Sequence, residues 1–317
     1  YGWNGGSVDK DTYFAMARGT QGREESDGVP AMEMTKWFDT NYHYIVPEFS
    51  SDTSFELASR KPVIEFQEAL ELGIETRPVL IGPVSYLLLG KGSDVEPLEL
   101  LDDVLPVYAE LLAELEAAGA KWIQLDEPFL TMELSAEASD AYRRAYDALS
   151  EKLTSVRLLV ASYFGELREN AELAFSLPVS AVHVDLESAR DAQRHEEALE
   201  HALAHLREGQ ILSLGIVNGR NVWRTDFEGA LERLEHVAER LGSERLIVGS
   251  SCSLLHSPVD LELETELDPE IRRWLAYAKQ KVHEIGVLSQ ALNEGREAVS
   301  DALEENAHAI ESRRSSQ

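Results

Sequence analysis

Two adjacent carboxylates are the first residues in this sequence whose types and spacing could do chemistry. Asp126 and Glu127 close the short apolar run WIQLDEP, which extends from Trp122 to Pro128. Paired carboxylates can be driven to different pKa values and then act as an acid and a base. Neighbouring strand residues point to opposite faces, so only one of the two is expected to face a pocket unless the strand has already ended. The simpler interpretation is that one carboxylate caps the next helix or holds the end of a barrel together.

One thiol and three imidazoles are the candidates for a metal site. Cys252 is the single cysteine of the chain, and His43, His183 and His256 lie on or beside apolar runs. Zinc needs about four ligands, typically several Cys or His. The histidines have no H-x-x-x-H or H-E-x-x-H spacing, and histidines in such positions are more often hydrogen-bonded core residues. We therefore expect no metal ion in this chain.

Two further polar groups could bind a ligand. The turn Asn218-Gly219-Arg220-Asn221 carries a guanidinium that could structure a barrel mouth or a domain interface. It is equally well explained as a turn that needs Gly and Asn for positive φ. Lys36 lies between apolar residues in MTKWFDTNYHY, together with Asn41. An ammonium group can pair with ligand carboxylates, although a lone lysine is usually only solvated.

The elements that must position these groups alternate between short apolar strands and amphipathic helices. Strands are predicted at the start of Arg77–Gly90 and within Trp122–Pro128, Arg157–Gly165, Ala181–Glu187, Ile211–Trp223 and Arg245–His256. Helices are predicted at Pro97–Ala118, Ala136–Leu153, Asn170–Phe175, Glu196–Leu206, Glu228–Arg240, Pro269–Leu292 and Gly295–Glu311. The N-terminal part is broken up by glycines and read as irregular, and Lys36–Phe49 reads as extended.

Six apolar strands, each separated from the next by a helix, indicate a parallel sheet with helix-covered faces. The polar groups follow the strands' carboxyl ends, where active sites lie in barrels and in doubly wound sheets. No glycine-rich phosphate loop follows a strand, which disfavours a dinucleotide-binding sheet. We therefore expect an α/β fold of the (β/α)8 TIM-barrel type, with about six of its eight strand–helix units present. The missing strands should precede Tyr1.

Composition narrows the possible partners. The formal net charge is −29 and the sequence pI is about 4.6, which argues against binding to nucleic acid or to an anionic membrane. No apolar run approaches ~18 residues, and the N-terminus lacks the features of a signal peptide. It also lacks an initiator Met, which suggests a fragment. One cysteine excludes an intrachain disulfide, so a reducing cytoplasmic setting is expected. Two explanations of the acidity are equally good: a strongly solvated surface and a salt-tolerant source.

Several long blocks resemble one known family, the cobalamin-independent methionine synthases (5-methyltetrahydropteroyltriglutamate–homocysteine methyltransferases), in their N-terminal domain. They run in family order from about Gly6 to Arg314 and so cover nearly the whole chain. The blocks are MTKWFDTNYHYIVPEF, RPVLIGPVSYLLLGK, WIQLDEP, LSLGIVNGRNVWR, SSCSLLHSPVDL and WLAYAKQK.

The resemblance implies two fused barrels, of which this chain is most of the first. Methyl transfer from 5-methyltetrahydropteroyl-triglutamate to homocysteine would depend on zinc in the second barrel, with no cobalamin. Lys36 and Asn41 match family positions that help to bind the folate polyglutamate. The resemblance implies an irregular segment 1–35, the barrel 36–292, and a helix 293–317 that leads toward the linker. The chain alone is then expected to bind the folate tail, to brace the second barrel, and to have no turnover.

The same resemblance gives Cys252 a position close to that of a zinc-binding cysteine in the second barrel. The companion positions are lost, because the run Arg157–Gly165 ends in Ser162-Tyr163-Phe164. Cys252 is therefore expected to be a packed relic. Two alternatives stay open: a barrel hydrolase that uses Asp126 and Glu127, and a non-catalytic subunit of a split methyltransferase whose zinc barrel is a separate chain.

Overall fold

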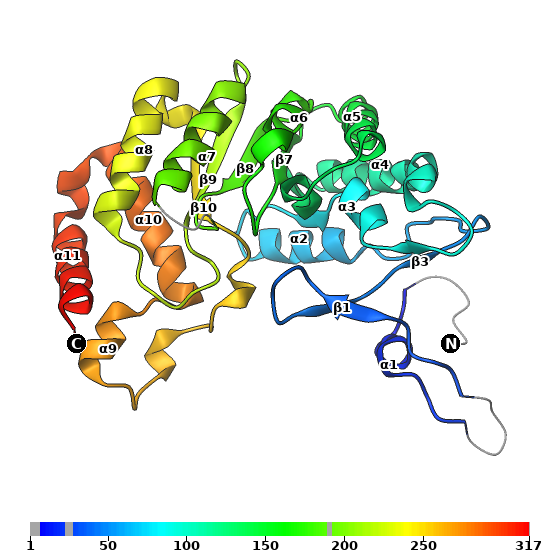
Figure 1. The fold of residues 1–317 in the computed structure, drawn as a ribbon, viewed down its shortest axis with the longest axis horizontal. Helices are drawn as coiled ribbons and strands as arrows, with labels where there is room; N and C mark the ends of the chain where they lie inside the picture. The colour runs from blue at the N-terminus through cyan, green and yellow to red at the C-terminus, as the bar shows by residue number, and fades with distance from the viewer. Residues whose placement is uncertain (1–6, 23–27, 189–191, 317) are drawn as a thin grey trace. The chain divides into compact units, whose positions relative to one another are not determined.

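The computed structural model describes residues 7–22, 28–188 and 192–316 (Figure 1). Residues 1–6 and 23–27 of the segment expected to be irregular, and Gln317 of the tail, lie outside the described residues. By its internal contacts the chain divides into two compact units. Unit 1 comprises the described parts of Tyr1–Phe129 with Glu133–Val160 and Leu177–Val179, and unit 2 comprises Leu130–Met132, Ala161–Ser176 and the described parts of Ser180–Gln317.

All six predicted strands form, and they belong to one sheet of order β10-β9-β8-β7-β6-β4. The pairs β4–β6, β8–β9 and β9–β10 are parallel. This confirms the α/β fold with a parallel sheet, while in the described residues the sheet is open and its order ends at β4 and β10. The strands are β4 (Val79–Ile81), β6 (Trp122–Asp126), β7 (Arg157–Ala161), β8 (Ala181–Asp185), β9 (Ile211–Val217) and β10 (Leu246–Ser250).

Unit 1 packs helices against β4 and β6, and its core is made by residues of both. Ile123 and Leu125 of β6 are fully buried, as are Leu112 and Leu115 at helical spacing. The predicted helix Pro97–Ala118 begins with the 3-10 turn η1 and continues as α4. The helices of this unit are α1 (Lys10–Arg18), α2 (Lys61–Glu71), α3 (Pro83–Leu88), η1 (Pro97–Leu100), α4 (Leu101–Ala117), η2 (Pro128–Thr131, whose last two residues belong to unit 2) and α5 (Ala136–Ser150).

The N-terminal part of unit 1 is more regular than its glycines suggested. Helix α1 lies in the stretch that was expected to be irregular, and it starts where the Asp9 carboxylate accepts the backbone N–H of Thr12 at 2.7 Å. The segment Lys36–Phe49 is extended only in part, because residues 37–42 form a tight turn. The short strands here are β1 (Met34–Lys36), β2 (His43–Ile45), β3 (Glu48–Phe49) and β5 (Lys91–Gly92).

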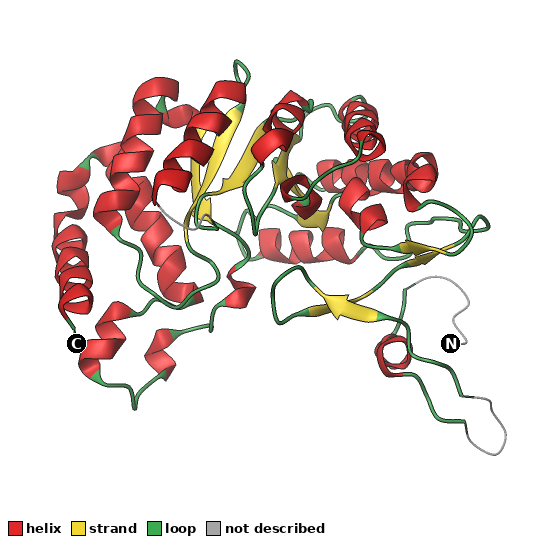
Figure 2. Ribbon diagram, viewed as in Figure 1, coloured by secondary structure: helices red, strands yellow, loops and turns green. Residues whose placement is uncertain are grey.

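In unit 2, helices pack against β9 and β10 (Figure 2). Helix α8 is amphipathic: one face buries Phe227, Ala230, Leu231, Leu234 and Val237 at helical spacing. Asp226 caps its start, and Gly242 ends it. The helices of this unit are η3 (Arg168–Asn170), α6 (Ala171–Ser176), α7 (Ala192–His205), α8 (Phe227–Leu241), η4 (Ser243–Arg245), η5 (Leu254–His256), η6 (Leu261–Leu263), α9 (Pro269–Trp274), α10 (Ala278–Glu294), η7 (Arg296–Val299) and α11 (Ser300–Ser315).

One helix prediction was wrong in unit 2. The stretch Pro269–Leu292 is not one helix, because Leu275 is extended and forms a β-bridge with Trp223. The next residue, Ala276, donates its N–H to the Val222 carbonyl at 2.9 Å. The bridge of Leu275 and the hydrogen bond of Ala276 stabilise an extended backbone here more than the helical sequence pattern stabilises a continuous helix. No helix in the described part of the chain is both long and apolar enough to cross a bilayer.

Candidate functional site

Lys36 and Asn41 are brought together at one end of an exposed hairpin in unit 1. Lys36 is the last residue of β1 and is paired in register with His43 of β2. The turn between them is closed by Trp37, whose N–H donates to the Tyr42 carbonyl at 2.8 Å. Both the Lys36 and Asn41 side chains are exposed, and neither makes a hydrogen bond or ion pair with other described residues. An ammonium and an amide are thus available to a ligand on the same turn.

Asp126 and Glu127 point to different surroundings, as the alternation of a strand requires. Asp126 accepts a hydrogen bond from Gln124, two residues earlier on β6, at 2.7 Å. Glu127 is fully buried and accepts the backbone N–H of Ser85, in the first turn of α3, at 2.8 Å. The expectation that one carboxylate caps a helix is right, but the helix is the earlier α3 and not the next one along the chain. Pairing of β4 with β6 places the start of α3 beside Glu127.

Two tyrosines complete the surroundings of Glu127. The hydroxyl of Tyr146 donates to its carboxylate at 2.9 Å and that of Tyr142 at 3.3 Å. Burial raises the pKa of Glu127 to about 7, although the hydrogen bonds from Ser85 and Tyr146 oppose that change. Because the carboxylate is fully buried and accepts these hydrogen bonds, it is not placed to touch a substrate. This geometry removes the basis for a hydrolase that uses Asp126 and Glu127.

A second buried carboxylate organises the strand ends of unit 2. Asp185, at the end of β8, accepts the backbone N–H groups of Phe164, Glu187 and Ser188 at 2.8–3.0 Å. It also accepts the Ser188 hydroxyl. Burial raises the pKa of Asp185, and these hydrogen bonds partly offset that effect. Phe164 is held with φ of 69°, a left-handed conformation that is strained for an aromatic residue.

The Phe164 ring packs against the side chains of Arg220 and His256. The Arg220 guanidinium lies 5.0 Å from the centre of the Phe164 ring, and the His256 ring lies 5.4 Å from it. The ends of β7, β9 and β10 therefore meet in one cluster, as the carboxyl ends of parallel strands should. Asn218 has a local role, because its Oδ1 accepts the N–H groups of Arg220 and Asn221 at 2.9 and 3.1 Å.

The segment 218–226, which follows β9, is fixed by side chains from later helices. Lys281 of α10 is fully buried and donates to the Trp223 carbonyl at 3.0 Å and to Asn221 Oδ1 at 3.3 Å. One turn further along α10, the Glu284 carboxylate accepts the N–H and hydroxyl of Thr225 at 3.1 and 2.8 Å. Asn306 of α11 donates to the Thr225 carbonyl at 2.8 Å. We call 218–226 the clamped loop.

Sequence reasoning missed Lys281 and Glu284. Both lie on the face of α10 that also buries Val287, Leu288 and Ala291. Charged residues at apolar positions of a helical pattern are the signal that could have revealed them, since a buried charge needs specific partners. Burial lowers the pKa of Lys281 and raises that of Glu284.

Cys252 and the candidate histidines lie in different parts of the structure and are not gathered into one site. Cys252 is 5% exposed, and burial raises the pKa of its thiol to about 12. It lies under Gly219, where an added Cβ would meet its Sγ at 2.9 Å. His183 lies in the sheet, with Nδ1 2.9 Å from the Ser213 hydroxyl, whereas His43 is in the exposed hairpin. Among the described residues no three Cys, His, Asp or Glu side chains are arranged to share a metal ion.

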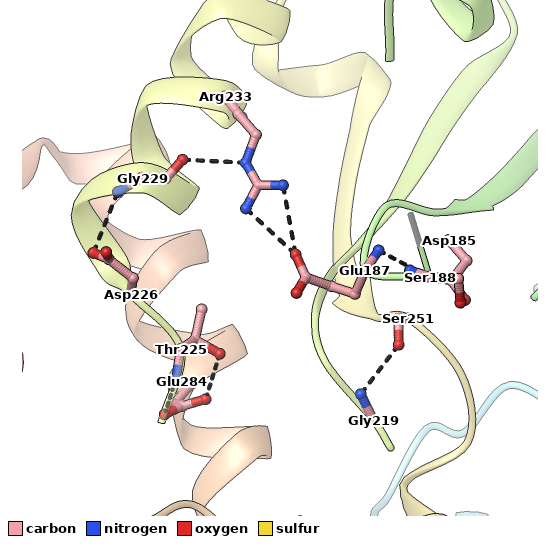
Figure 3. Close-up of polar contacts among 10 residues, drawn as sticks. All are labelled: Asp185, Glu187, Ser188, Gly219, Thr225, Asp226, Gly229, Arg233, Ser251 and Glu284. Atoms are coloured by element: carbon pink, nitrogen blue, oxygen red, sulfur yellow. Dashed lines mark hydrogen bonds and ion pairs between the residues drawn. The ribbon is translucent and has the colours of Figure 1, made fainter. Parts of the chain in front are cut away.

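A pocket of about 440 Å³ lies beside the clamped loop in unit 2. The loop contributes Asn218, Asn221 and Trp223 to its wall, and α8 and α11 contribute Arg233 and Arg313. Figure 3 shows part of this wall, with the Arg233 guanidinium reaching the Glu187 carboxylate at 3.4 Å and the Gly229 carbonyl at 3.2 Å. The same view shows Thr225 held by Glu284 and Gly219 held by Ser251.

Comparison with known proteins agrees with the resemblance. Residues 1–242 match the family model described as "Cobalamin-independent synthase, N-terminal domain". A Caulobacter vibrioides protein named 5-methyltetrahydropteroyltriglutamate–homocysteine methyltransferase is 53% identical over all of this chain and 42% of its own length. A Salinibacter ruber protein of the same name is 50% identical over 96% of this chain and 39% of its own length. The chain thus spans about two fifths of these relatives.

Solved structures with a similar fold have low sequence identity. A B12-independent methionine synthase from Shewanella sp. W3-18-1 matches with a TM-score of 0.57 at 17% identity, over 86% of this chain and 75% of that one. A putative vitamin-B12 independent methionine synthase from Listeria monocytogenes gives 0.54 at 14% identity, over 77% and 72%. At this identity the likeness concerns the fold alone.

Proposed function

The chain belongs to the cobalamin-independent synthase family as its N-terminal domain, and from this premise we propose that it serves a methionine synthase. The reaction would move a methyl group from 5-methyltetrahydropteroyltri-L-glutamate to L-homocysteine. The observation that carries the proposal is the roughly 50% identity, over the whole chain, to relatives named for this activity. The chain's part would be to bind the folate polyglutamate and to support a catalytic domain in the rest of a longer polypeptide.

The proposed folate contacts are Lys36 and Asn41. A triglutamate tail carries several carboxylates, and the Lys36 ammonium and Asn41 amide are exposed together on one hairpin end. In unit 2, we propose that Asn218 and Arg220 line the mouth of the barrel, and in unit 1 that Asp126 does so. Glu127 is not proposed to line the mouth, because its buried carboxylate caps α3.

Zinc would belong to the second domain and not to this chain. A metal-bound homocysteine thiol is deprotonated to the thiolate, which is the nucleophile that methyl transfer needs. The donor set in this chain does not fit such a site: Cys252 is buried, and Ser162, Tyr163 and Phe164 at the end of β7 include neither Cys nor His. The chain alone is proposed to have no turnover, and no cobalamin is required in this family.

The open sheet is proposed to be part of an eight-stranded barrel, of which residues 36–292 supply the six strands of this sheet. Segment 1–35 precedes this region, and a helical segment, 293–317, follows it. The edge strands support this, because every residue of β10 is only half-buried and Val79 of β4 is 53% exposed, whereas β8 is buried throughout. Further strands beside β4 and β10 would cover these residues. We also propose a cytoplasmic setting, in which a lone unpaired cysteine is ordinary.

The direct test is kinetic and uses the full-length enzyme. Lys36→Ala should raise the KM for the triglutamate folate by about tenfold or more, as expected for one lost charge-assisted contact, with a much smaller effect for the monoglutamate. Lys152→Ala removes an exposed lysine elsewhere in unit 1 and should change neither KM. Equal effects of Lys36→Ala on both folates would refute tail binding by this residue.

A second assay tests the division of labour. Methionine formation is measured with zinc present, first for this chain alone and then after it is mixed with the separately expressed remainder of the polypeptide. We expect no methionine formation by the chain alone and turnover once the two parts are mixed. Zinc-dependent turnover by the chain alone would show that the chemistry lies here after all.

A further inference from the structure

The pocket beside the clamped loop has a wall that is fixed before any ligand arrives. Lys281 and Glu284 are 0% and 4% exposed, and their side chains form hydrogen bonds with that loop. Burying charge is costly unless specific partners compensate it. A wall held in this way loses little freedom on binding, which favours affinity.

The charges that line this pocket are not all used within the protein. Arg224 pairs with Glu305 at 2.8 Å, and Arg233 with Glu187 at 3.4 Å. Asp226 is taken by Arg314 at 2.8 Å.

Arg313 differs from the other arginines of the pocket, because it is only partly buried and its side chain makes no hydrogen bond or ion pair with other described residues. Its Nη1 is buried without a partner, so the remaining N–H groups of the guanidinium are the ones that can reach a ligand. Its guanidinium lies 5.3 Å from the centre of the Trp223 ring. On the acidic side, Glu196 and Glu232 line the pocket and form no ion pair with other described residues. The pocket therefore offers one guanidinium and two carboxylates to a ligand.

We propose that this pocket binds a free α-amino acid as its zwitterion. The ligand carboxylate would accept hydrogen bonds from Arg313, and its ammonium group would face Glu232 and Glu196. The apolar side chain would pack on Trp223, which is 45% exposed. A phosphate or a polycarboxylate suits the site poorly, because the two glutamates repel it. The pocket volume of about 440 Å³ is in the range of small-molecule sites.

This site is independent of the proposed methyl transfer, and the test keeps the two apart. The full-length protein is titrated with L-leucine, which is neither the thiol substrate nor its methylated product. Tryptophan fluorescence follows binding, since Trp223 lies in the wall, and Trp223→Phe should remove the signal while calorimetry still detects binding. Leucinamide lacks the carboxylate and N-acetyl-leucine lacks the ammonium group, so each should bind about tenfold or more weakly.

Variants then assign the two charged contacts. Arg313→Gln and Glu232→Gln should each weaken leucine binding about tenfold or more, and Arg313→Lys should fall between Arg313→Gln and the unchanged protein. Arg143→Gln, an exposed arginine of α5, is the matched control and should bind normally. Circular dichroism checks that each variant is folded. The proposal is overturned if no saturable binding is found, if leucinamide binds as well as leucine, or if Arg313→Gln and Arg313→Lys bind normally.

Discussion

At the scale of single residues, two buried carboxylates show where sequence reasoning stops. The sequence indicated that Asp126 and Glu127 would face different surroundings, because strand alternation is a local rule. It could not show that Glu127 would reach α3, some forty residues earlier, since that contact depends on which strands pair. Lys281 and Glu284 were missed for the same reason, as their partners lie about 60 positions away in the clamped loop.

Glu127 makes stability depend on pH in a definite direction. Its folded pKa of about 7 lies above the ordinary value of 4.5, so the folded state binds the proton more tightly. The resulting stability is fully present below about pH 4.5 and is lost as pH rises through about 7. Glu127→Gln cannot titrate, so the fall in unfolding free energy between pH 5 and pH 8 should be smaller in this variant. Urea unfolding at both pH values measures the difference.

Asp185, Glu187 and Glu284 also have pKa values raised by burial, so the variant should reduce the slope and not abolish it. Glu127→Ala is the companion experiment. It removes the acceptor of the Ser85 N–H and of the Tyr146 hydroxyl and should cost about 2–4 kcal/mol at either pH. An unchanged slope in Glu127→Gln would mean that this carboxyl does not titrate as proposed.

At the scale of elements, the strands were the most predictable part of the fold. Each is a short, continuous apolar run of strand length that alternates with a helical pattern, which is typical of a strand buried in a parallel sheet. Helix boundaries were less predictable where long-range contacts intervene, as at Leu275, which bridges to Trp223. The helices α1, α2 and α3 were not predicted, and α3 follows a Gly-Pro pair that was read only as the end of a strand. The site was predictable as a set of strand ends, whereas its anchors in α10 and α11 were not.

The junction between β4 and α3 depends on Gly82. A Cβ at this position would lie 2.0 Å from Glu127 Oε1, so alanine must push the carboxylate off the helix start. Gly82→Ala should therefore lower the unfolding free energy by about 2–4 kcal/mol. Gly286→Ala in α10 has nothing within 4 Å of the added Cβ and should instead raise it by about 0.5–1 kcal/mol. Thermal and urea unfolding of the pair give the comparison, and equal effects would contradict the crowding at Gly82.

At the scale of the whole molecule, the dominant feature is a net charge of −29. Like charges on one surface destabilise the compact state, and salt screens them within about 10 Å at 0.1 M. Many ion pairs of the described residues are exposed, such as Arg60–Glu110, and each adds little to the free energy of unfolding. Screening should therefore outweigh the weakening of these pairs.

The melting temperature should consequently rise by several degrees between about 0.05 and 1 M KCl. The control is the same titration near the sequence pI of about 4.6, where the net charge is small and the rise should be much reduced. A flat curve at neutral pH would show that self-repulsion is not a major term, and it would also remove the suggestion of a salt-tolerant source.

The clamped loop also has a consequence for how the chain is made. Asn306, which holds Thr225, is added 81 positions later. At about 5–20 residues per second, a ribosome takes several seconds to supply it. Early in that interval the segment after β9 has been synthesised but has no anchor. Lys281 and Glu284 of α10 follow about 60 positions after it, and Asn306 of α11 comes last. The wall of the pocket is therefore among the last parts of unit 2 to take its final shape, and chains released before α11 would never complete it.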